Sequence, residues 1–305
     1  MTVGPGRGCE LLVVGSANAD LVVGVERRPG PGETVLGSDL VVHPGGKGGN
    51  QAVAAARLGA RTALLARVGD DAHGRLLLEA QRAAGVDTSG VLVGGAPTGV
   101  ALITVDPSGD NSIVVSPGAN AHLTPADVRA AGALLAQAPV ISTQLEIPLD
   151  TVAEVVRRLP PGSRFVLNPS PPAALPAEVL AACDPLVLNE HEARALLGPD
   201  AGPRPEDWAR GLLALGPRSV VVTLGPEGAL TAATGTAPLR VPSLPVKAVD
   251  TTGAGDAFTA ALSWHLSTGA PLPTATTFAT RVGAAAVTRR GAQESYPTLG
   301  EVPEG

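Results

Sequence analysis

The sequence is poor in aromatic residues and in cysteine. Phe, Trp and Tyr make up only 2% of its 305 residues, while 44% are hydrophobic and 16% are charged. An apolar fraction of this size argues against a disordered chain, and the core must be built mainly from Ala, Val and Leu. The two cysteines, Cys9 and Cys183, do not make a disulfide framework, so we expect both to be core or surface thiols.

Long apolar runs and an excess of positive charge are also missing. No stretch reaches the ~18 consecutive apolar residues of a membrane helix, and the apolar run in residues 1–15 is too short for a signal peptide. The formal net charge is −6, which argues against a general nucleic-acid surface because such surfaces are basic. We therefore expect a cytoplasmic protein that binds neither nucleic acid nor a membrane.

The signatures of several familiar sites are absent. The segment "HPGGKGGNQ" looks like a P-loop, but Lys47 is followed by Gly48 where that motif needs Ser or Thr. No G-x-G-x-x-G follows a strand, no Cys/His spacing fits zinc, and no G-x-S-x-G nucleophile elbow occurs. The function must therefore be sought in less familiar patterns.

Strand-like and helix-like segments alternate along most of the chain. Expected strands lie at 11–15, 62–69, 139–144, 164–170, 185–190 and 219–225, and expected helices at 48–60, 71–85, 149–159 and after Gly255. This alternation predicts an α/β fold with a mostly parallel central sheet flanked by helices on both faces. We expect residues 1–305 to form a single domain of this kind, with a surface loop at 199–205 and a frayed tail from residue 296.

Two regions break the alternation and contain only strand-like runs. Residues 20–43 hold two such runs around a Pro/Gly turn, and residues 98–116 hold two more. The joint "DPSGD" in the second region is a strong hairpin signal. Four short strands without helices predict a separate small β-sheet that serves either as a lid over a site or as an interface.

The segment "AVDTTGAGDAFTAAL", residues 248–262, places two glycines and an aspartate at a helix start. Gly253 and Gly255 would each cost about 1 kcal/mol inside a helix, but they allow a sharp turn or a close approach to a ligand. Free N–H groups at a helix start suit an anion such as a phosphate. Asp256 is a poor anion binder because of its charge, and a plausible proton acceptor.

Other polar residues follow the expected strands. Asn18 and Asp20 lie just beyond the first strand, where they could bind sugar hydroxyls or simply form a turn. Lys47 and Asn50 belong to a glycine cluster that either approaches a ligand or forms a flexible loop before a helix. Glu146 ends another strand, where it could bind a hydroxyl or cap the next helix.

Two further segments are ambiguous in the same way. Asn189 and Glu192 are three residues apart at a helix start, which is typical of a capping box. The same pair could hold phosphates, with Glu192 acting through water and a metal ion. The segment "TLGPEG", residues 223–228, suits a phosphate or ribose contact but also resembles an ordinary αβ loop.

Taken in order, these segments resemble the PfkB carbohydrate kinase family. The resemblance extends from "GSANAD" to "TRRGAQES" and includes "PGPGETV", "HPGGKGGNQAVAAARLGA", "QLEIP", "NEHEA", "TLGPEG" and "VDTTGAGDAF". Each motif is weak alone, whereas the ordered set is highly specific. The resemblance implies a central α/β domain with a β-sheet lid, and a homodimer in which the lids pair.

The resemblance also implies an activity, which is transfer of the γ-phosphate of ATP to the O5 hydroxyl of D-ribose with Asp256 as general base. It places the sugar against Asn18, Asp20, Gly46, Lys47, Gly48, Gly49, Asn50, Glu146 and Asp256. It places ATP against Asn189, Glu192, Thr223, Gly225, Gly228, Gly253, Ala254, Gly255 and Thr280. The last position departs from the family, which commonly has His or Asn near the adenine.

Two metal ions are implied as well. Mg²⁺ would neutralise the phosphates. A monovalent cation, usually K⁺, would be held by Asp250, Thr252, Ala286, Arg289, Gly291 and Ser295, several of them through backbone carbonyls.

Two alternatives stay open. Another kinase of the same family could act on deoxyribose, a nucleoside or a keto-sugar acid, although the few aromatic residues argue against a nucleoside pocket. A catalytically silent sugar-binding or regulatory protein could share the fold. The presence of Asp256, Lys47 and the two glycines Gly253 and Gly255 argues against that second alternative.

Overall fold

The computed structural model describes residues 8–107 and 110–304. Residues 1–7 and the tip of the "DPSGD" turn, residues 108–109, therefore lie outside the described residues. Among the residues described, no helix is both long enough and apolar enough to cross a bilayer.

The centre of the molecule is a nine-stranded sheet with the order β13-β12-β11-β10-β9-β8-β1-β4-β5. Its strands are β1 (Leu11–Val14), β4 (Thr62–Val68), β5 (Val91–Val93), β8 (Val140–Gln144), β9 (Arg164–Asn168), β10 (Cys183–Asn189), β11 (Ser219–Thr223), β12 (Ala229–Ala233) and β13 (Leu239–Val241). Neighbours from β5 to β11 pair in parallel, and β12 and β13 are added antiparallel. The predicted mostly parallel sheet is confirmed, and only the short strands β5, β12 and β13 had no prediction.

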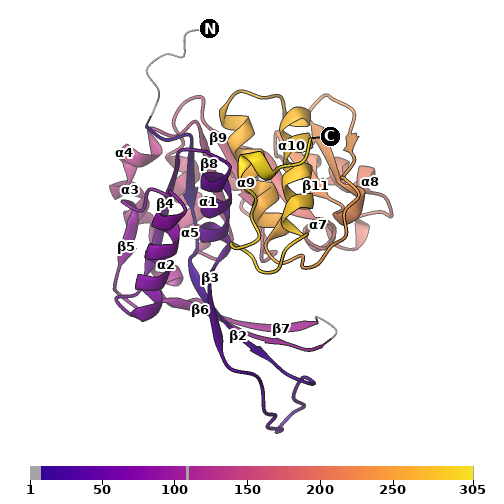
Figure 1. Cartoon of the computed structure of the whole chain (residues 1–305). Helices are drawn as coiled ribbons and strands as arrows, with labels where there is room; N and C mark the ends of the chain where they lie inside the picture. Colours follow the sequence, from indigo (N-terminus) through magenta and orange to yellow (C-terminus); the bar gives the residue numbers. More distant parts are fainter. Residues whose placement is uncertain (1–7, 108–109, 305) are drawn as a thin grey trace.

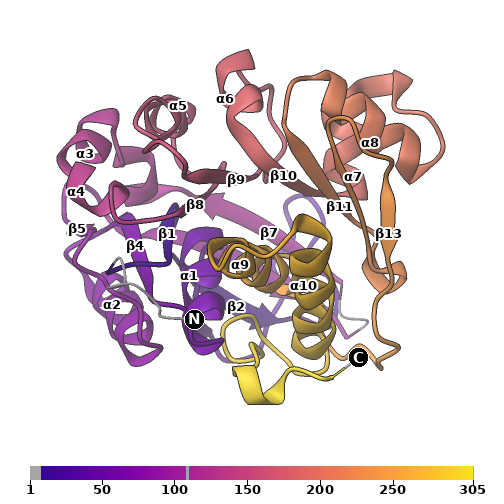
Figure 2. The same cartoon turned by 90° about the horizontal axis from the view of Figure 1, so that it is seen from above.

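Helices cover both faces of this sheet (Figure 2). One face packs against α1 (Lys47–Arg57), α9 (Ala254–Ser267) and α10 (Leu272–Ala286), with α2 (Ala72–Ala83) beside α1. The other face is covered by α3 (Pro125–Ala130), α4 (Gly132–Leu135), α5 (Leu149–Arg157), α6 (Ala177–Ala182), α7 (Glu190–Leu197) and α8 (Pro205–Ala214). Alternate residues of one strand enter the two cores: Leu11 and Val13 face α1, while Leu12 and Val14 face α5. The helices on both faces are therefore as the alternation predicted.

Single-turn 3₁₀ helices complete the chain at η1 (Gly118–His122), η2 (Gly198–Asp200), η3 (Gly225–Glu227) and η4 (Leu299–Glu301). The surface loop expected at 199–205 is shorter than predicted, because η2 enters it and α8 begins at Pro205. Cys9 and Cys183 are both buried and unbridged, in line with core thiols.

The four remaining strands form a separate sheet with the order β3-β2-β6-β7, as the sequence predicted. They are β2 (Asn18–Gly24), β3 (Val41–Gly45), β6 (Gly99–Val105) and β7 (Asn111–Ser116). This small sheet projects away from the main body (Figure 1). It starts at Asn18, only four residues after β1 ends, so the two sheets meet at the carboxyl end of β1.

Two local predictions were wrong. The helix expected after Gly255 begins at Ala254, with Gly253 as its N-cap, so Gly255 lies in its first turn. The tail is not frayed from residue 296, because Tyr296 is fully buried and Thr298 caps η4 in a capping box with Glu301. In both places a tertiary contact or a cap fixes backbone that composition alone marked as loose.

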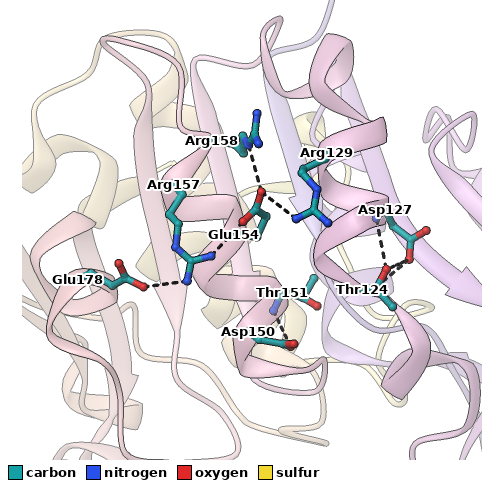
Figure 3. Close-up of polar contacts among 9 residues, drawn as sticks. All are labelled: Thr124, Asp127, Arg129, Asp150, Thr151, Glu154, Arg157, Arg158 and Glu178. Atoms are coloured by element: carbon teal, nitrogen blue, oxygen red, sulfur yellow. Dashed lines mark hydrogen bonds and ion pairs between the residues drawn. The ribbon is translucent and has the colours of Figure 1, made fainter.

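On the outer helix layer one carboxylate joins two helices, and a second carboxylate extends the network to a third (Figure 3). Glu154 of α5, whose side chain is 8% exposed, forms ion pairs with Arg129 of α3 and with Arg157 and Arg158 at the end of α5. Arg157 also pairs with Glu178 of α6. The hydrogen bond from Arg158, with those from Arg157 and Arg129, lowers the pKa of Glu154 against the opposing effect of burial.

Candidate functional site

A cavity of about 190 Å³ lies where three neighbouring parallel strands end. Asn168 ends β9, Asn189 ends β10 and Thr223 ends β11. The start of α9 closes the cavity from the other side. The lining residues are Lys47, Asn168, Val187, Leu188, Asn189, Glu192, Thr223, Gly253, Gly255, Asp256 and Thr259. A crevice outside the carboxyl ends of strands is the usual ligand site of open α/β sheets.

Asp256 is one of two buried carboxylates that line this cavity, the other being Glu192. Asp256 lies in the first turn of α9 and is 7% exposed. Asn50 donates to its Oδ2 over 3.0 Å and Gln51 donates to its Oδ1 over 3.3 Å. Burial raises the pKa of Asp256, while the positive charge of Lys47 and the two amide donors oppose that rise. The group is therefore held where it can accept a proton.

Lys47 is surrounded by carboxylates. Burial alone would lower the pKa of its ammonium, but Asp256, Glu146 and Glu192 together raise it. Its backbone N–H donates to Glu146 Oε2 over 3.1 Å, and Ser16 Oγ donates to the same oxygen over 2.5 Å. The Lys47 ammonium therefore places a positive charge in the cavity, beside the carboxylates that the sequence predicted to bind sugar.

Asn18 and Asp20 begin the small sheet beside this cluster. Asn120 donates to Asn18 Oδ1 over 2.7 Å and its own Oδ1 accepts from the Ala17 N–H, which fixes the Asn18 amide. Burial and the negative charge of Glu146 raise the pKa of Asp20 to about 7. The structure thus gathers Asn18, Asp20, Lys47, Asn50, Glu146 and Asp256 from segments far apart in the sequence.

The glycines before and within α1 have a packing role. A side-chain atom built on Gly46 would lie 2.6 Å from the Asn18 nitrogen, and one on Gly48 2.6 Å from the Ser16 nitrogen. One on Gly49 would lie 2.7 Å from Gln81. Gly46 and Gly48 are therefore needed for the close approach of α1 to the backbone of residues 15–18, whereas at Gly49 only the movable end of the Gln81 side chain is in the way.

The residues expected to contact nucleotide fall into two groups. Asn189, Glu192, Thr223, Gly253 and Gly255 line the cavity, and Ala254 lies between those two glycines as the first residue of α9. Asn189 and Glu192 also form the capping box of α7, with the Glu192 N–H donating to Asn189 Oδ1 over 2.8 Å. Gly225 begins η3 and Gly228 is its C-cap, and neither is among the residues that line the cavity. Both interpretations of the Asn189–Glu192 pair are therefore compatible with the geometry.

Thr280 does not line this cavity. It is 5% exposed on α10, and its hydroxyl donates to the Thr277 carbonyl over 2.8 Å. Its side chain is therefore committed to its own helix.

The two segments expected to hold a monovalent cation lie side by side. Asp250 Oδ2 accepts from the Gly291 N–H over 2.9 Å, and Oδ1 accepts from the Thr252 N–H over 2.9 Å. The N–H groups of Val249 and Asp250 donate to the Val287 carbonyl. Arg289 instead pairs with Glu301, and Ser295 donates to the Ala292 carbonyl. Asp250 therefore joins the two segments, and both of its carboxylate oxygens already accept backbone N–H groups.

Several residues of the site were missed by sequence reasoning. Ser16, Gln51, Asn120, Asn168 and Thr259 all contact the cluster or line the cavity. Asn168 ends a predicted strand, so the rule that singled out Asn18 would have found it. Asn120 offers no local signal, because its partner Asn18 is 102 residues away.

Fold and site together define an α/β phosphotransferase in which a buried carboxylate meets the N-terminus of a helix beside a lysine. The family model described as pfkB family carbohydrate kinase matches residues 10–299, and the chain belongs to this family.

Similar proteins agree with that assignment. The ribokinase of Bacillus subtilis (strain 168) is 41% identical over 96% of this chain and 98% of its own length. The deoxyribokinase of Salmonella typhimurium is 34% identical over 97% and 98%. The crystal structure of ribokinase from Thermotoga maritima has a TM-score of 0.90 at 36% identity, covering 96% of this chain and 98% of that one. The structure of Arabidopsis thaliana ribokinase complexed with ribose and ATP has a TM-score of 0.87 at 33% identity, covering 96% and 97%.

Proposed function

We propose that the protein is a ribokinase, which transfers the γ-phosphate of ATP to O5 of D-ribose and yields D-ribose 5-phosphate. The observation that supports this best is the buried Asp256 at the start of α9, beside Lys47 and facing the cavity. The ribokinase relatives span nearly the whole chain, and one is described as complexed with ribose and ATP.

In this proposal each end of the site has its own ligand. Asn18, Asp20, Asn50 and Glu146 accept and donate hydrogen bonds to the sugar hydroxyls, together with the α1 start from Gly46 to Gly49. Asn189, Thr223 and the loop with Gly225 and Gly228 contact the nucleotide. Thr280 is buried and hydrogen-bonded within α10, so it gives the adenine neither a ring nor a free hydroxyl.

The chemistry follows from two kinds of group at the start of α9, the Asp256 carboxylate and the backbone N–H groups beside it. Asp256 takes the proton from the sugar hydroxyl, and general-base action of this kind typically contributes 10²–10⁴-fold. The backbone N–H groups of Gly255 and Asp256 occupy the first helical turn, where no acceptor exists within the helix. They stabilise the negative charge of the transferring phosphoryl, for which one such donor is worth ~2.7–4 kcal/mol. Lys47 adds a positive charge to the same site.

Two ions belong to the proposal. Mg²⁺ supplies charge neutralisation for the phosphates, and Glu192 is the carboxylate on the nucleotide side that suits it through water. K⁺ would be held at Asp250 and by carbonyls of the 286–295 segment. It would order the backbone next to α9 and would not touch substrate.

The small sheet acts as a lid in this proposal and pairs with the lid of a second copy. Its strands leave apolar side chains exposed, among them Leu102 at 52% and Val114 at 65%. These two are direct cross-strand neighbours in the β6–β7 pair. A second copy of the chain would cover them.

The test is an assay of the purified protein with ATP, Mg²⁺ and K⁺ against a panel of pentoses, hexoses, nucleosides and keto-sugar acids. Ribose should give by far the highest kcat/KM. A lead for deoxyribose would instead favour the second candidate, to which the deoxyribokinase relatives point. Replacing K⁺ with a large organic cation should lower the rate, and an unchanged rate would argue against the ion site.

Asp256→Asn tests the proposed base. The amide cannot accept the proton, so kcat should fall by about 10²–10⁴-fold or more while ribose binding, measured by calorimetry, stays within about threefold. Activity retained in this variant would exclude Asp256 as the base.

A further inference from the structure

Gln51 lies next to the proposed base but out of reach of any substrate. It follows Asn50 in the first turns of α1 and is 0% exposed. It does not line the cavity. Its side-chain amide contacts three other side chains, one on α9 and two on β8: Asp256, Ser142 and Gln144. A buried amide between the base and the central sheet cannot bind a ligand directly. It can act on the base only through the orientation of its own hydrogen-bonding groups.

The two β8 residues determine which way the amide points. Ser142 Oγ donates to Gln51 Oε1 over 2.9 Å, and Gln144 Nε2 donates to the same oxygen over 2.6 Å. Because its oxygen is occupied by two donors, the amide turns its nitrogen to the other side. There Nε2 donates to Asp256 Oδ1 over 3.3 Å. The reverse orientation would place the amide oxygen against an ionised carboxylate oxygen.

Asn50 holds the second carboxylate oxygen in a different way. Its Nδ2 donates to Asp256 Oδ2 over 3.0 Å, and its Oδ1 accepts from Gln293 Nε2 over 3.0 Å. Asn50 is also a proposed sugar ligand, so its hydrogen bonds are free to rearrange when sugar binds. Gln51 is shielded from the sugar, and its contact with Asp256 is the one that can persist through the reaction.

We infer that Gln51 is a positioning residue for the base: aimed by Ser142 and Gln144, it fixes the plane of the Asp256 carboxylate so that Oδ2 faces the acceptor hydroxyl. This inference rests on the proposed function, in which Asp256 is the base. Each carboxylate oxygen has two lone pairs, so a hydrogen bond from Gln51 or Asn50 leaves room for the substrate proton.

The electrostatic consequence of losing Gln51 has a definite sign. Burial raises the pKa of Asp256, and Lys47 on α1, Asn50 and Gln51 lower it, while Glu146 after β8 raises it. Asp20 of the small sheet and Tyr296 also face this carboxylate. All of these except Gln51 are unchanged in a variant at position 51. Loss of its donor therefore raises the pKa of Asp256 and moves the acidic limb of the kcat/KM profile to higher pH.

Gln51→Met and Gln51→Glu test the inference, with Gln81→Met as the matched control. Gln81 is 1% exposed on α2, and neither of its amide atoms has a partner among the residues described. With the sugar that the wild type phosphorylates fastest, Q51M should lower kcat on the order of 10- to 100-fold, as expected for a misplaced base. The KM values for the sugar and for ATP should stay within about twofold of the wild-type values. Q51E preserves an acceptor for Ser142 and Gln144 but places a second negative charge beside Asp256, so its acidic limb should shift further.

Q81M should leave the pH profile in place. Wild-type kcat and an unshifted profile in Q51M would overturn the inference, as would equal losses in Q51M and Q81M, which indicate a packing role only. If Q51M does not fold, Q51E decides by the same two readouts.

Carbon-13 NMR of the Asp256 carboxyl gives its pKa without turnover. A rise in Q51M supports the inference and an unchanged value overturns it, even if the substrate panel shows that the protein phosphorylates no sugar.

Discussion

The two glycines at the start of α9 have opposite surroundings. Gly253 has φ +72°, and a side-chain atom there would lie 2.5 Å from the Tyr296 hydroxyl. Gly255 has no heavy atom within 4 Å of the same ideal position, although it lies within a helix and lines the cavity. Gly253 is therefore required by the fold, whereas the protein alone leaves room for a side chain at Gly255, as we expect if a ligand approaches its backbone.

Gly255→Ala should separate stability from function. Alanine is favoured over glycine in a helix by about 1 kcal/mol, so the melting temperature of the ligand-free protein should rise or stay unchanged. The added methyl group occupies the phosphate side of the cavity, so kcat/KM should fall by at least about tenfold. Differential scanning fluorimetry and the kinase assay measure the two effects.

Gly253→Ala is the matched control. It forces a left-handed backbone and a close contact onto a side chain, so it should lower the melting temperature by several degrees. A destabilised Gly255→Ala, or one with full activity, would contradict the division between the two glycines.

At the scale of elements, the outer helix layer depends on one carboxylate. Glu154 joins α3 and α5 through Arg129, Arg157 and Arg158, and Arg157 also pairs with Glu178 of α6 (Figure 3). The pKa of Glu154 is held below the ordinary value of 4.5. A carboxyl with a lowered pKa in the folded state contributes stability above its unfolded pKa, and this contribution is lost as the pH falls through the folded pKa.

Glu154→Gln should therefore lower the melting temperature most near pH 7, because three arginines then lose their shared counter-charge. The difference from wild type should shrink as the pH falls from 4.5, where the unfolded carboxyl protonates, through the lower pKa of the folded state. Glu178→Gln is the control, since that exposed carboxylate pairs with Arg157 alone and should change little. A difference between E154Q and wild type that does not depend on pH would contradict the assignment.

At the scale of the whole molecule, the meeting of two sheets creates the site. The nine-stranded sheet supplies the cavity edge, and the small sheet brings Asn18 and Asp20 toward it from the end of β1 (Figure 1). Asp20 pairs with Ala101, which is 6% exposed, whereas the next residue along, Leu102, is 52% exposed. Because side chains alternate along a strand, Leu102 and its neighbour Val114 face away from Asp20. That outer face is the one that a second lid would cover.

Val114→Asp should convert a dimer into a monomer, because a charge at the centre of an apolar contact is costly to bury. Light scattering after size-exclusion chromatography gives the mass directly. Leu299→Asp is the control, because Leu299 is also an apolar residue and is 52% exposed, but it lies on η4. This change should leave the mass unchanged. A monomeric wild type at micromolar concentration would refute pairing through the small sheet.

Much of the architecture followed from the sequence because strand and helix periods are local properties. The parallel sheet, the helices on both faces, the separate sheet and the polar residues at strand ends were all predicted from short segments. Asp256, Lys47 and Glu192 were singled out because each lies in a motif whose spacing fits a helix start. The errors at Gly255 and in the tail arose where a distant contact or a cap fixes backbone that looks flexible in isolation.

The amino-acid sequence by itself determined the set of helices and strands and the polar residues that lie at their ends. Only the tertiary structure decided which of those ends share one site, because that depends on contacts such as Gln51 to Asp256, which are 205 residues apart. It also decided the electrostatics of individual groups: burial raises the pKa of Asp256 against the opposing effect of Lys47, Asn50 and Gln51, whereas three arginines lower the pKa of Glu154. Local pattern cannot distinguish two such carboxylates, because the pKa of each is set by neighbours that only folding brings within reach.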